Sequence, residues 1–381
     1  MRGPMLGLLA LVVAPVRLVA QEVSPCQACH QAIVASFLET AHFRTSAEAT
    51  PHTVKGRFSE GHNLLRTSSE SVYFRMERRG GVSYQTGIDL RRGISITKRI
   101  DIVVGSGRRG QSYLYWSRGL LFELPVSYLS GVDRWINSPG YADGEIDFGR
   151  IIVPRCLECH STSFVLQTDR GVTRYSRGYV LGIACDKCHG DSRAHVRYQS
   201  SHPGDSSARY IVDPAHLSRD RKVDGCALCH SGERVPLVSP FSYRPGEKLD
   251  AYFMPEGEGS AVPDVHGNQV GLLRRSKCFR SSPEMSCATC HNVHQQQRDL
   301  AWFAQKCVGC HQTREHPMGD QIGDRLMTDC IDCHMPNRQS KAIQINTPTK
   351  PFVLYFRSHA IGIYPAVARA VLRSNAEKPN R

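Results

Sequence analysis

The pattern Cys-x-x-Cys-His occurs seven times in the chain and uses fourteen of its fifteen cysteines. Two thiols three positions apart can each form a thioether with a vinyl group of one haem, while the histidine that follows binds the iron. Zinc sites also use paired cysteines, but tetrahedral zinc requires no histidine directly after every pair, and disulfides require it even less. We therefore predict seven covalently attached haems c.

Each predicted haem has two attachment cysteines and one proximal histidine. The attachment cysteines are Cys26, Cys29, Cys156, Cys159, Cys185, Cys188, Cys226, Cys229, Cys287, Cys290, Cys307, Cys310, Cys330 and Cys333. The proximal histidines are His30, His160, His189, His230, His291, His311 and His334. For the remaining cysteine, Cys278, three interpretations stay open: a thiolate ligand, a free thiol or a buried side chain. We favour the buried side chain.

The second axial ligand decides whether a haem only transfers electrons or also offers a place for substrate. Ten histidines lie outside the motifs, which is enough for seven bis-histidine haems. We select histidines close to a motif, and one within a predicted helix over 31–44; His62 is chosen last, for the seventh haem. Methionine ligands at Met254, Met285, Met318 and Met327 stay open. The predicted distal ligands are His42, His62, His195, His266, His294, His316 and His359.

The spacing of the motifs divides the chain. One motif stands near the N-terminus, a long stretch without a motif follows, and six motifs are grouped after it. The gaps between these six are too short for separate hydrophobic cores. We predict a mainly α-helical and irregular multihaem cytochrome c fold with a haem-filled core, plus a small antiparallel β-rich insertion. The predicted segments are a signal peptide at 1–20, a single-haem segment at 21–54, the haem-free insertion at 55–150, a six-haem domain at 151–360 and a tail at 361–381.

The haem-free insertion has the composition of β-structure. Short runs at 72–76, 81–86, 100–104 and 112–116 are rich in Val, Ile, Tyr and Phe and are separated by glycine. Gly105, Gly107 and Gly110 spell GxGxxG, the glycine pattern of dinucleotide sites. The residues that follow are strand-like rather than a helix start, so we predict a hairpin turn there instead of a nucleotide site.

The N-terminus is typical of an export signal. Arg2 precedes an apolar run at 5–13, and Ala20 is a small residue before a cleavage point. A membrane-spanning helix needs roughly 20 apolar residues, so we expect no transmembrane anchor. The formal net charge is +13, but the basic residues are scattered, and seven haems add about fourteen propionate charges. We expect a periplasmic or secreted protein that does not bind nucleic acid.

Several stretches resemble the multihaem c-type cytochromes related to the tetrahaem cytochrome of ammonia oxidisers, often described as doubled-CxxCH proteins. They include CDKCHGDSRAH, DVHGNQV, SKCF, MSCATCHNVH, CVGCHQTREHP, CIDCHMP, TAHFRTS and GSGRRGQSYLYW. The resemblance implies a chain of closely packed haem pairs, with His195, His294, His316 and His42 as distal ligands. Many similar chains continue into tetratricopeptide repeats; here we expect a short helix and tail after His359 and no such docking platform.

Two functions from different classes fit these features. The favoured hypothesis is an electron-transfer protein without catalytic residues, which exchanges electrons with redox partner proteins or quinol-linked donors and which can form oligomers. The alternative is a multihaem oxidoreductase of small nitrogen or sulfur compounds with one five-coordinate haem, for which we expect the first haem. No motif has lysine in place of its histidine, and distal ligands are ample, which favours electron transfer. The third hypothesis is a structural or binding role for the β-unit, in which the haems only stabilise the fold.

Overall fold

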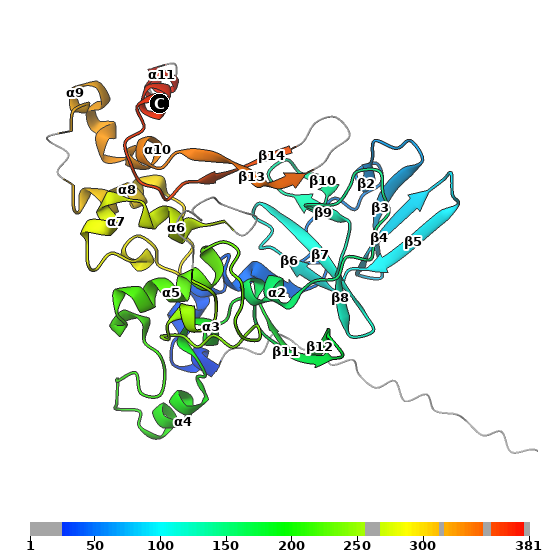
Figure 1. Ribbon diagram of the computed structural model, residues 1–381, viewed down its shortest axis with the longest axis horizontal. Helices are drawn as coiled ribbons and strands as arrows, with labels where there is room; N and C mark the ends of the chain where they lie inside the picture. Colours follow the sequence, from blue (N-terminus) through cyan, green and yellow to red (C-terminus); the bar gives the residue numbers. More distant parts are fainter. Residues whose placement is uncertain (1–24, 256–266, 312–315, 346–351, 377–381) are drawn as a thin grey trace, which may run out of the picture.

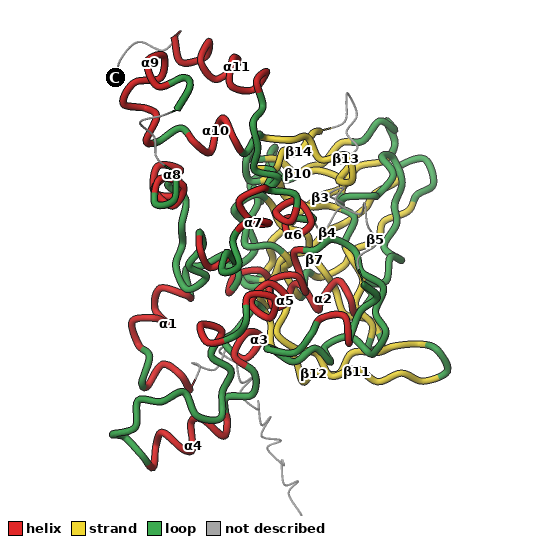
Figure 2. Tube along the Cα trace, turned by 60° about the vertical axis from the view of Figure 1, so that its left-hand side comes forward, coloured by secondary structure: helices red, strands yellow, loops and turns green. Residues whose placement is uncertain are grey.

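The computed structural model describes residues 25–255, 267–311, 316–345 and 352–376. Strands lie on one side of the molecule and short helices on the other, as two views show (Figures 1 and 2). The predicted signal peptide at 1–20 and the predicted ligand His266 fall outside these residues. Within the described part of the chain, no helix is long and apolar enough to cross a bilayer.

The predicted β-rich insertion contains two antiparallel sheets, and each of its four predicted runs overlaps a strand. One sheet has the order β2-β3-β4-β5, and the other has the order β1-β6-β7-β9-β10 with β8 paired to β7. The strands are β1 (Ser46–Glu48), β2 (Leu64–Arg66), β3 (Val72–Arg79), β4 (Val82–Asp89), β5 (Ile94–Arg99), β6 (Ile102–Val104), β7 (Gly110–Ser117), β8 (Leu120–Glu123), β9 (Val126–Leu129) and β10 (Arg134–Asn137). Strand β1 comes from the N-terminal segment, so that segment is anchored to the sheet.

Alternating residues bury both faces of the sheet that contains β7. Tyr113 and Tyr115 face a core shared with Phe74 and Met76 of the other sheet. The intervening Leu114 faces a second core with Leu157, which belongs to a haem motif helix. Side chains alternate between the two faces of a strand, so one strand can join both cores. The β-unit therefore holds the second haem motif directly.

The glycine-rich segment between β6 and β7 is the predicted hairpin turn, and this prediction is confirmed. The two strands pair antiparallel with Val104 opposite Ser112. Gly105 has a φ of +102°, and a Cβ atom there would lie 2.7 Å from the carbonyl oxygen of Gly110. Glycine is needed because the two arms of the turn approach closely at a positive φ. The GxGxxG pattern therefore belongs to this hairpin turn.

Two further hairpins lie beyond the insertion, where no strands were expected. They are β11 (Ser161–Asp169) with β12 (Val172–Leu181), and β13 (Asn337–Ile345) with β14 (Phe352–Arg357). The first hairpin turns at Arg170 and Gly171, both of which have positive φ. Two central residues with positive φ form the turn that best matches the twist of paired strands. The Asp-Arg-Gly sequence between two runs of β-branched residues could have indicated this hairpin.

The helices are short and occur mostly around the haem motifs. The α-helices are α1 (Gln31–Phe37), α2 (Pro154–His160), α3 (Asp186–His189), α4 (Arg193–Ser201), α5 (Arg219–His230), α6 (Gln269–Arg274), α7 (Lys277–Ser281), α8 (Leu300–Val308), α9 (Gly319–Ile322), α10 (Cys330–His334) and α11 (Pro365–Ala376). The 3-10 helices are η1 (Pro25–Ala28), η2 (Phe43–Thr45), η3 (Pro214–His216), η4 (Leu249–Ala251), η5 (Cys287–Thr289) and η7 (Gly323–Met327). Apolar side chains packed around α5 form a small core. The haem-filled core stays a prediction.

The predicted helix over 31–44 is broken into two pieces. Helix α1 ends at Phe37, and η2 begins at Phe43. The Thr40 hydroxyl donates to the Phe37 carbonyl at 2.7 Å and accepts from the Phe43 N–H at 3.2 Å. A threonine side chain that bonds to nearby backbone in this way competes with helical hydrogen bonds. The break turns His42 toward a distant part of the chain.

Candidate functional site

Each Cys-x-x-Cys-His motif lies on a single helical turn. In four motifs the histidine N–H donates to the carbonyl of the first cysteine at 2.8–2.9 Å. In the other three, the motif lies within or ends α2, α5 or α10. Residues i, i+3 and i+4 share one face of a helix, so both sulfurs and the imidazole lie on one side of the turn. The cysteine thiols here stand for the thioether sulfurs of the haem-bound protein, and this arrangement fits haem c.

Four predicted distal histidines each face a proximal histidine from elsewhere in the chain. An imidazole nitrogen lies about 2.0–2.1 Å from a bound metal, so two imidazoles on opposite sides of one metal have ring centroids about 6 Å apart. The observed centroid distances are 6.1 Å for His42–His230, 6.0 Å for His294–His189, 6.1 Å for His359–His291 and 6.2 Å for His316–His334. All four therefore match the spacing of a bis-histidine iron.

Hydrogen bonds at Nδ1 orient several of these rings. Nδ1 of His189 donates to the Val212 carbonyl at 3.0 Å, and Nδ1 of His334 donates to the Gly362 carbonyl at 2.8 Å. His359 makes the equivalent bond to the Gln269 side-chain oxygen at 2.7 Å. A carbonyl can only accept, so each Nδ1 carries the proton and Nε2 is left with a free lone pair. This is the orientation in which histidine binds a metal.

Desolvation lowers the pKa of five of the facing imidazoles. It lowers the pKa of His230 and that of His359 to about 4, with neighbouring histidines adding to the effect. Desolvation also lowers the pKa of His42, His291 and His294. Metal ions bind neutral imidazole, so a lowered pKa favours ligation at neutral pH.

Two other predicted distal ligands are placed differently. His195 on α4 is half-buried, and its Nδ1 donates to the Arg209 carbonyl at 2.8 Å. His62 is exposed and lies 3.3 Å from the Arg57 guanidinium. Among the described residues, no ring contact joins either histidine to a proximal histidine. Of the seven predicted distal ligands, the structure thus brings four to a motif, and His266 lies outside the described residues.

Sulfur atoms of different motifs contact one another. The Cys159 and Cys229 thiols are hydrogen-bonded partners, which raises the pKa of Cys159. The Cys226 and Cys287 thiols are hydrogen-bonded partners too, which raises the pKa of Cys226. The Cys307 and Cys330 thiols form a third such pair, and there the pKa of Cys330 falls to about 7. The second motif therefore adjoins the fourth, the fourth adjoins the fifth, and the sixth adjoins the seventh.

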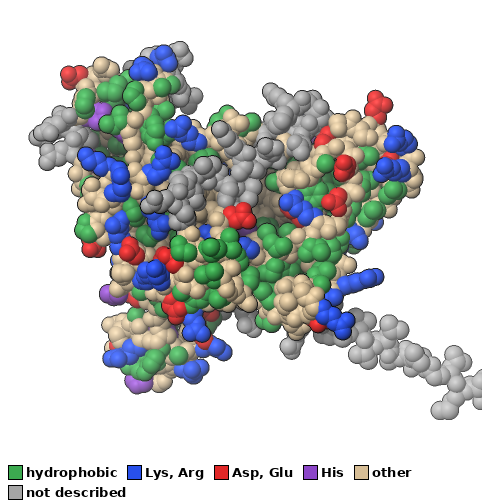
Figure 3. Space-filling model, viewed as in Figure 1, with side chains coloured by type: hydrophobic (Ala, Val, Ile, Leu, Met, Phe, Trp, Pro, Cys, Tyr) green, Lys and Arg blue, Asp and Glu red, His purple; other side chains and the backbone are tan. Residues whose placement is uncertain are grey.

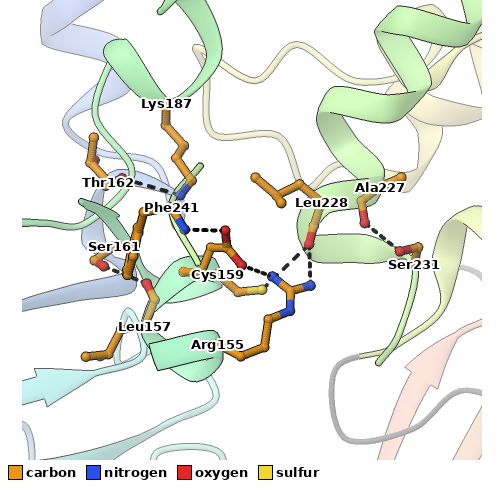
Figure 4. A network of polar contacts seen from close by, with 11 residues as sticks. Arg155, Leu157, Cys159, Ser161, Thr162, Lys187, Ala227, Leu228, Ser231 and Phe241 are labelled. Atoms are coloured by element: carbon orange, nitrogen blue, oxygen red, sulfur yellow. Dashed lines mark hydrogen bonds and ion pairs between the residues drawn. The ribbon is translucent and has the colours of Figure 1, made fainter. Parts of the chain in front are cut away.

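A network of buried charges ties three motifs together (Figure 4). Arg155, directly before the second motif, lies 2.8 Å from the Glu158 carboxylate and donates to the Leu228 carbonyl of the fourth motif at 2.7 Å. The other Glu158 oxygen accepts from the Phe241 N–H at 2.6 Å. Lys187 of the third motif has its ammonium 5.1 Å from the centre of the Phe241 ring. Glu158 is only 1% exposed, so its charge needs the Arg155 guanidinium beside it. Because Arg155 also bonds to the Leu228 carbonyl, the Arg155–Glu158 ion pair holds the second motif against the fourth.

Sequence reasoning missed Glu158 and Lys187 because it treated the two positions between the cysteines of a motif as spacers. Glu158 occupies such a position in the second motif, and Lys187 does so in the third. Haem motifs must pack against neighbouring motifs, so a charged side chain inside a motif could have indicated a buried, paired charge. Charged residues are seldom fully buried unless they are paired.

Gly182 positions the segment that carries His42. Its N–H donates to the Ser46 hydroxyl at 2.9 Å, and the following Ile183 N–H donates to the His42 carbonyl at 3.0 Å. Gly182 has a φ of +66°, and a Cβ atom there would lie 2.0 Å from the Phe43 carbonyl oxygen. Such a contact cannot be accommodated without moving backbone.

We expect Gly182→Ala to lower the free energy of unfolding by about 1–3 kcal/mol and to displace His42, because alanine adds a clash to an unfavourable φ. Urea unfolding of the haem-loaded protein, with its low-spin resonance signal, measures both effects. Gly171→Ala is the matched control: Gly171 has a φ of +78° with nothing within 4 Å of a Cβ atom. Equal losses in the two variants would contradict a positioning role for Gly182.

Comparisons of the sequence match the chain to cytochromes. Residues 143–190 match the family described as cytochrome c554 and c-prime. The C-type polyheme cytochrome OmcC of Geobacter sulfurreducens is 26% identical over 210 residues, which cover 48% of this chain and 26% of OmcC. The chain thus matches about a quarter of that relative's length.

A solved structure shares the fold. The crystal structure of the outer cell wall cytochrome OcwA has a TM-score of 0.56 and 14% sequence identity, and the match covers 91% of this chain and 80% of OcwA. At this identity the likeness concerns the fold alone. Together with the repeated attachment motif, these matches support a multihaem c-type cytochrome that binds haem c covalently.

Proposed function

We propose that the chain carries seven haems c and transfers electrons between redox partners outside the cytoplasm. The observation that supports this most directly is the contact between cysteines of different motifs, such as Cys159 with Cys229. Haem c, when bound, supplies an iron that gains or loses one electron. The chain itself sets the order and spacing of the attachment points.

Six of the seven attachment points, those of the second to the seventh motif, form a continuous series. Besides the three sulfur contacts, Cys188 of the third motif interacts electrostatically with Cys226 of the fourth. Cys290 of the fifth motif interacts in the same way with Cys307 of the sixth. The second and third motifs thus both adjoin the fourth, and the series continues through the fifth and sixth to the seventh. A series without a gap is what stepwise electron transfer requires.

We also propose the distal ligands. His42, His294, His359 and His316 serve the motifs of His230, His189, His291 and His334, as the centroid distances of 6.0–6.2 Å support. His195, His266 and His62 remain proposed ligands for the other three haems. For the first motif we favour His195, because α4 lies just below the N-terminal segment that contains α1 (Figures 1 and 2).

Location and partners follow from the sequence. We propose export through the signal at 1–20 and exchange with redox proteins or quinol-linked donors. On the face shown in Figure 3, Lys and Arg side chains are spread among acidic and apolar ones instead of forming one patch. This distribution suits partners other than nucleic acid, whose phosphate backbone attracts clustered basic residues. We further propose that copies of the chain can associate.

The proposal is tested by a haem-to-protein ratio and by electron paramagnetic resonance of the oxidised protein, with and without nitrite or hydroxylamine. We expect seven haems per chain, all low-spin and unchanged by either additive. A high-spin signal that shifts with an additive would instead assign an open iron and favour the oxidoreductase alternative. A ratio below seven would show that some motifs are not loaded.

A further inference from the structure

A largely buried carboxyl group lies where the β-unit meets the second haem motif. Glu123 ends β8, and its side chain is 13% exposed. Its N–H donates to the Arg150 carbonyl at 2.9 Å, and the Ile152 N–H donates to the Leu121 carbonyl at 2.9 Å. The chain at 150–152 therefore runs beside β8 and leads directly into α2, which carries Cys156.

The charged and titratable groups around this carboxyl come from several elements. Arg150 lies 3.3 Å from the carboxylate, donates to the Pro139 carbonyl at 2.8 Å and is 44% exposed. Ser112 of β7 hydrogen-bonds to the carboxylate. The Tyr141 hydroxyl donates to the Glu123 carbonyl at 2.8 Å. The other titratable groups near this cluster are Cys156 on α2, and Tyr115 and Asp147, which act on Tyr141.

These surroundings allow the Glu123 carboxyl to gain or lose a proton near neutral pH. Desolvation raises the pKa of Glu123 to about 7, although the Arg150 guanidinium and the Ser112 hydroxyl act in the opposite direction. A single guanidinium that is itself partly in water offsets only part of the cost of burying a carboxylate. The exposed side of Arg150 connects the site with solvent, so a proton can enter and leave.

The same carboxyl is electrostatically coupled to the second motif. After desolvation, the Glu123 charge is the largest influence that raises the pKa of the Cys156 thiol. That thiol stands for a thioether sulfur of the haem-bound protein. Charges interact more strongly across protein interior than across water. A charge added to the group attached at Cys156 is therefore felt at Glu123, and the reverse holds too.

We propose that Glu123 takes up a proton when the haem attached at Cys156 and Cys159 is reduced, and releases it when that haem is reoxidised. The electron comes from a neighbouring reduced haem of the series, and the proton comes from water by way of the Arg150 side. One O–H bond forms on the Glu123 carboxylate on reduction and breaks on oxidation. This inference rests on the proposed electron-transfer function and couples one step of it to a proton.

The test compares wild type with Glu123→Gln, which keeps size and hydrogen bonding but cannot ionise. In the haem-loaded wild type, we expect the midpoint potential of one haem to fall as the pH rises between about 6 and 8. In Glu123→Gln, that pH dependence is expected to be lost. Haem propionates are present in both proteins, so the difference between them belongs to Glu123.

Infrared difference spectra give a second readout. Reduced-minus-oxidised spectra of wild type near pH 7 should show the carbonyl stretch of a newly protonated carboxylic acid, absent in Glu123→Gln. Glu77→Gln is the matched control, since Glu77 pairs with Arg79 at 2.6 Å on β3 and should leave both signals unchanged. Should Glu123→Gln not fold, Arg150→Gln should move the pH-dependent range upward.

Unchanged pH dependence in Glu123→Gln, no upward movement in Arg150→Gln, or a wild-type potential that does not vary with pH would each overturn the inference. These outcomes are separable from failure of the proposed function. If all seven haems are present, low-spin and reducible while Glu123 has no effect, only the proton coupling is wrong. A deficit of haems would instead contradict the proposed function.

Discussion

Replacing His42 with alanine is expected to convert one haem per chain from low-spin to high-spin. His42 faces His230 at a centroid distance of 6.1 Å and is our proposed distal ligand of the fourth motif, so removing its imidazole should leave that iron with one protein ligand. Electron paramagnetic resonance of the oxidised protein measures the change. Added imidazole should restore the low-spin signal, because the free ligand can occupy the place of the lost side chain.

His52→Ala is the control for this experiment. His52 is exposed and lies in a turn next to the same N-terminal segment, so its loss should leave every haem low-spin. The haem-to-protein ratio should be equal in wild type and both variants, because neither residue attaches a haem. A fully low-spin spectrum in His42→Ala would show that another group binds this iron.

Replacing Arg155 with alanine is expected to lower the free energy of unfolding by about 3–5 kcal/mol. The Arg155 and Glu158 side chains are 15% and 2% exposed, and the substitution leaves a buried carboxylate that still accepts a hydrogen bond from the Phe241 N–H and interacts electrostatically with Lys187. It also removes the bond to the Leu228 carbonyl that joins the second and fourth motifs. Urea unfolding of the haem-loaded protein at neutral pH measures the loss.

Two comparisons isolate the buried charge as the cause. Arg193→Ala breaks a pair whose side chains are 81% and 56% exposed, and we expect little change in stability. The double variant Arg155→Met with Glu158→Leu replaces both charges with apolar groups and should recover most of the loss. If Arg155→Ala were no more harmful than Arg193→Ala, water would be reaching the Glu158 carboxylate.

The strands of the β-unit were predictable because their signal is local. In β3, buried Val72, Phe74 and Met76 alternate with more exposed residues, a period that only a strand satisfies. The hairpin of β11 and β12 follows the second motif so closely that we read its residues as part of the haem domain. The break in the helix over 31–44 depends on one Thr40 hydroxyl, which an apolar pattern does not reveal.

The partners that bury the two carboxylates could not be identified from sequence. Glu123 looks like an ordinary surface residue in its local context, and for Glu158 the one sequence signal was its place between the two cysteines of a motif. Their burial results from distant segments, the chain at 150–152 in one case and Phe241 in the other. Burial of a charge depends on which surfaces meet, and these surfaces are formed by residues far apart in the chain.

By itself, the sequence determined the attachment chemistry. Two thiols and an imidazole at i, i+3 and i+4 meet on one helical turn, so the seven predicted sites need only local structure. Tertiary structure alone decided which distant histidine faces which motif, as His42 does His230, and which motifs adjoin. These contacts join residues far apart along the chain, so they depend on how the sheets and helices pack, and spacing in the sequence carries no record of that packing.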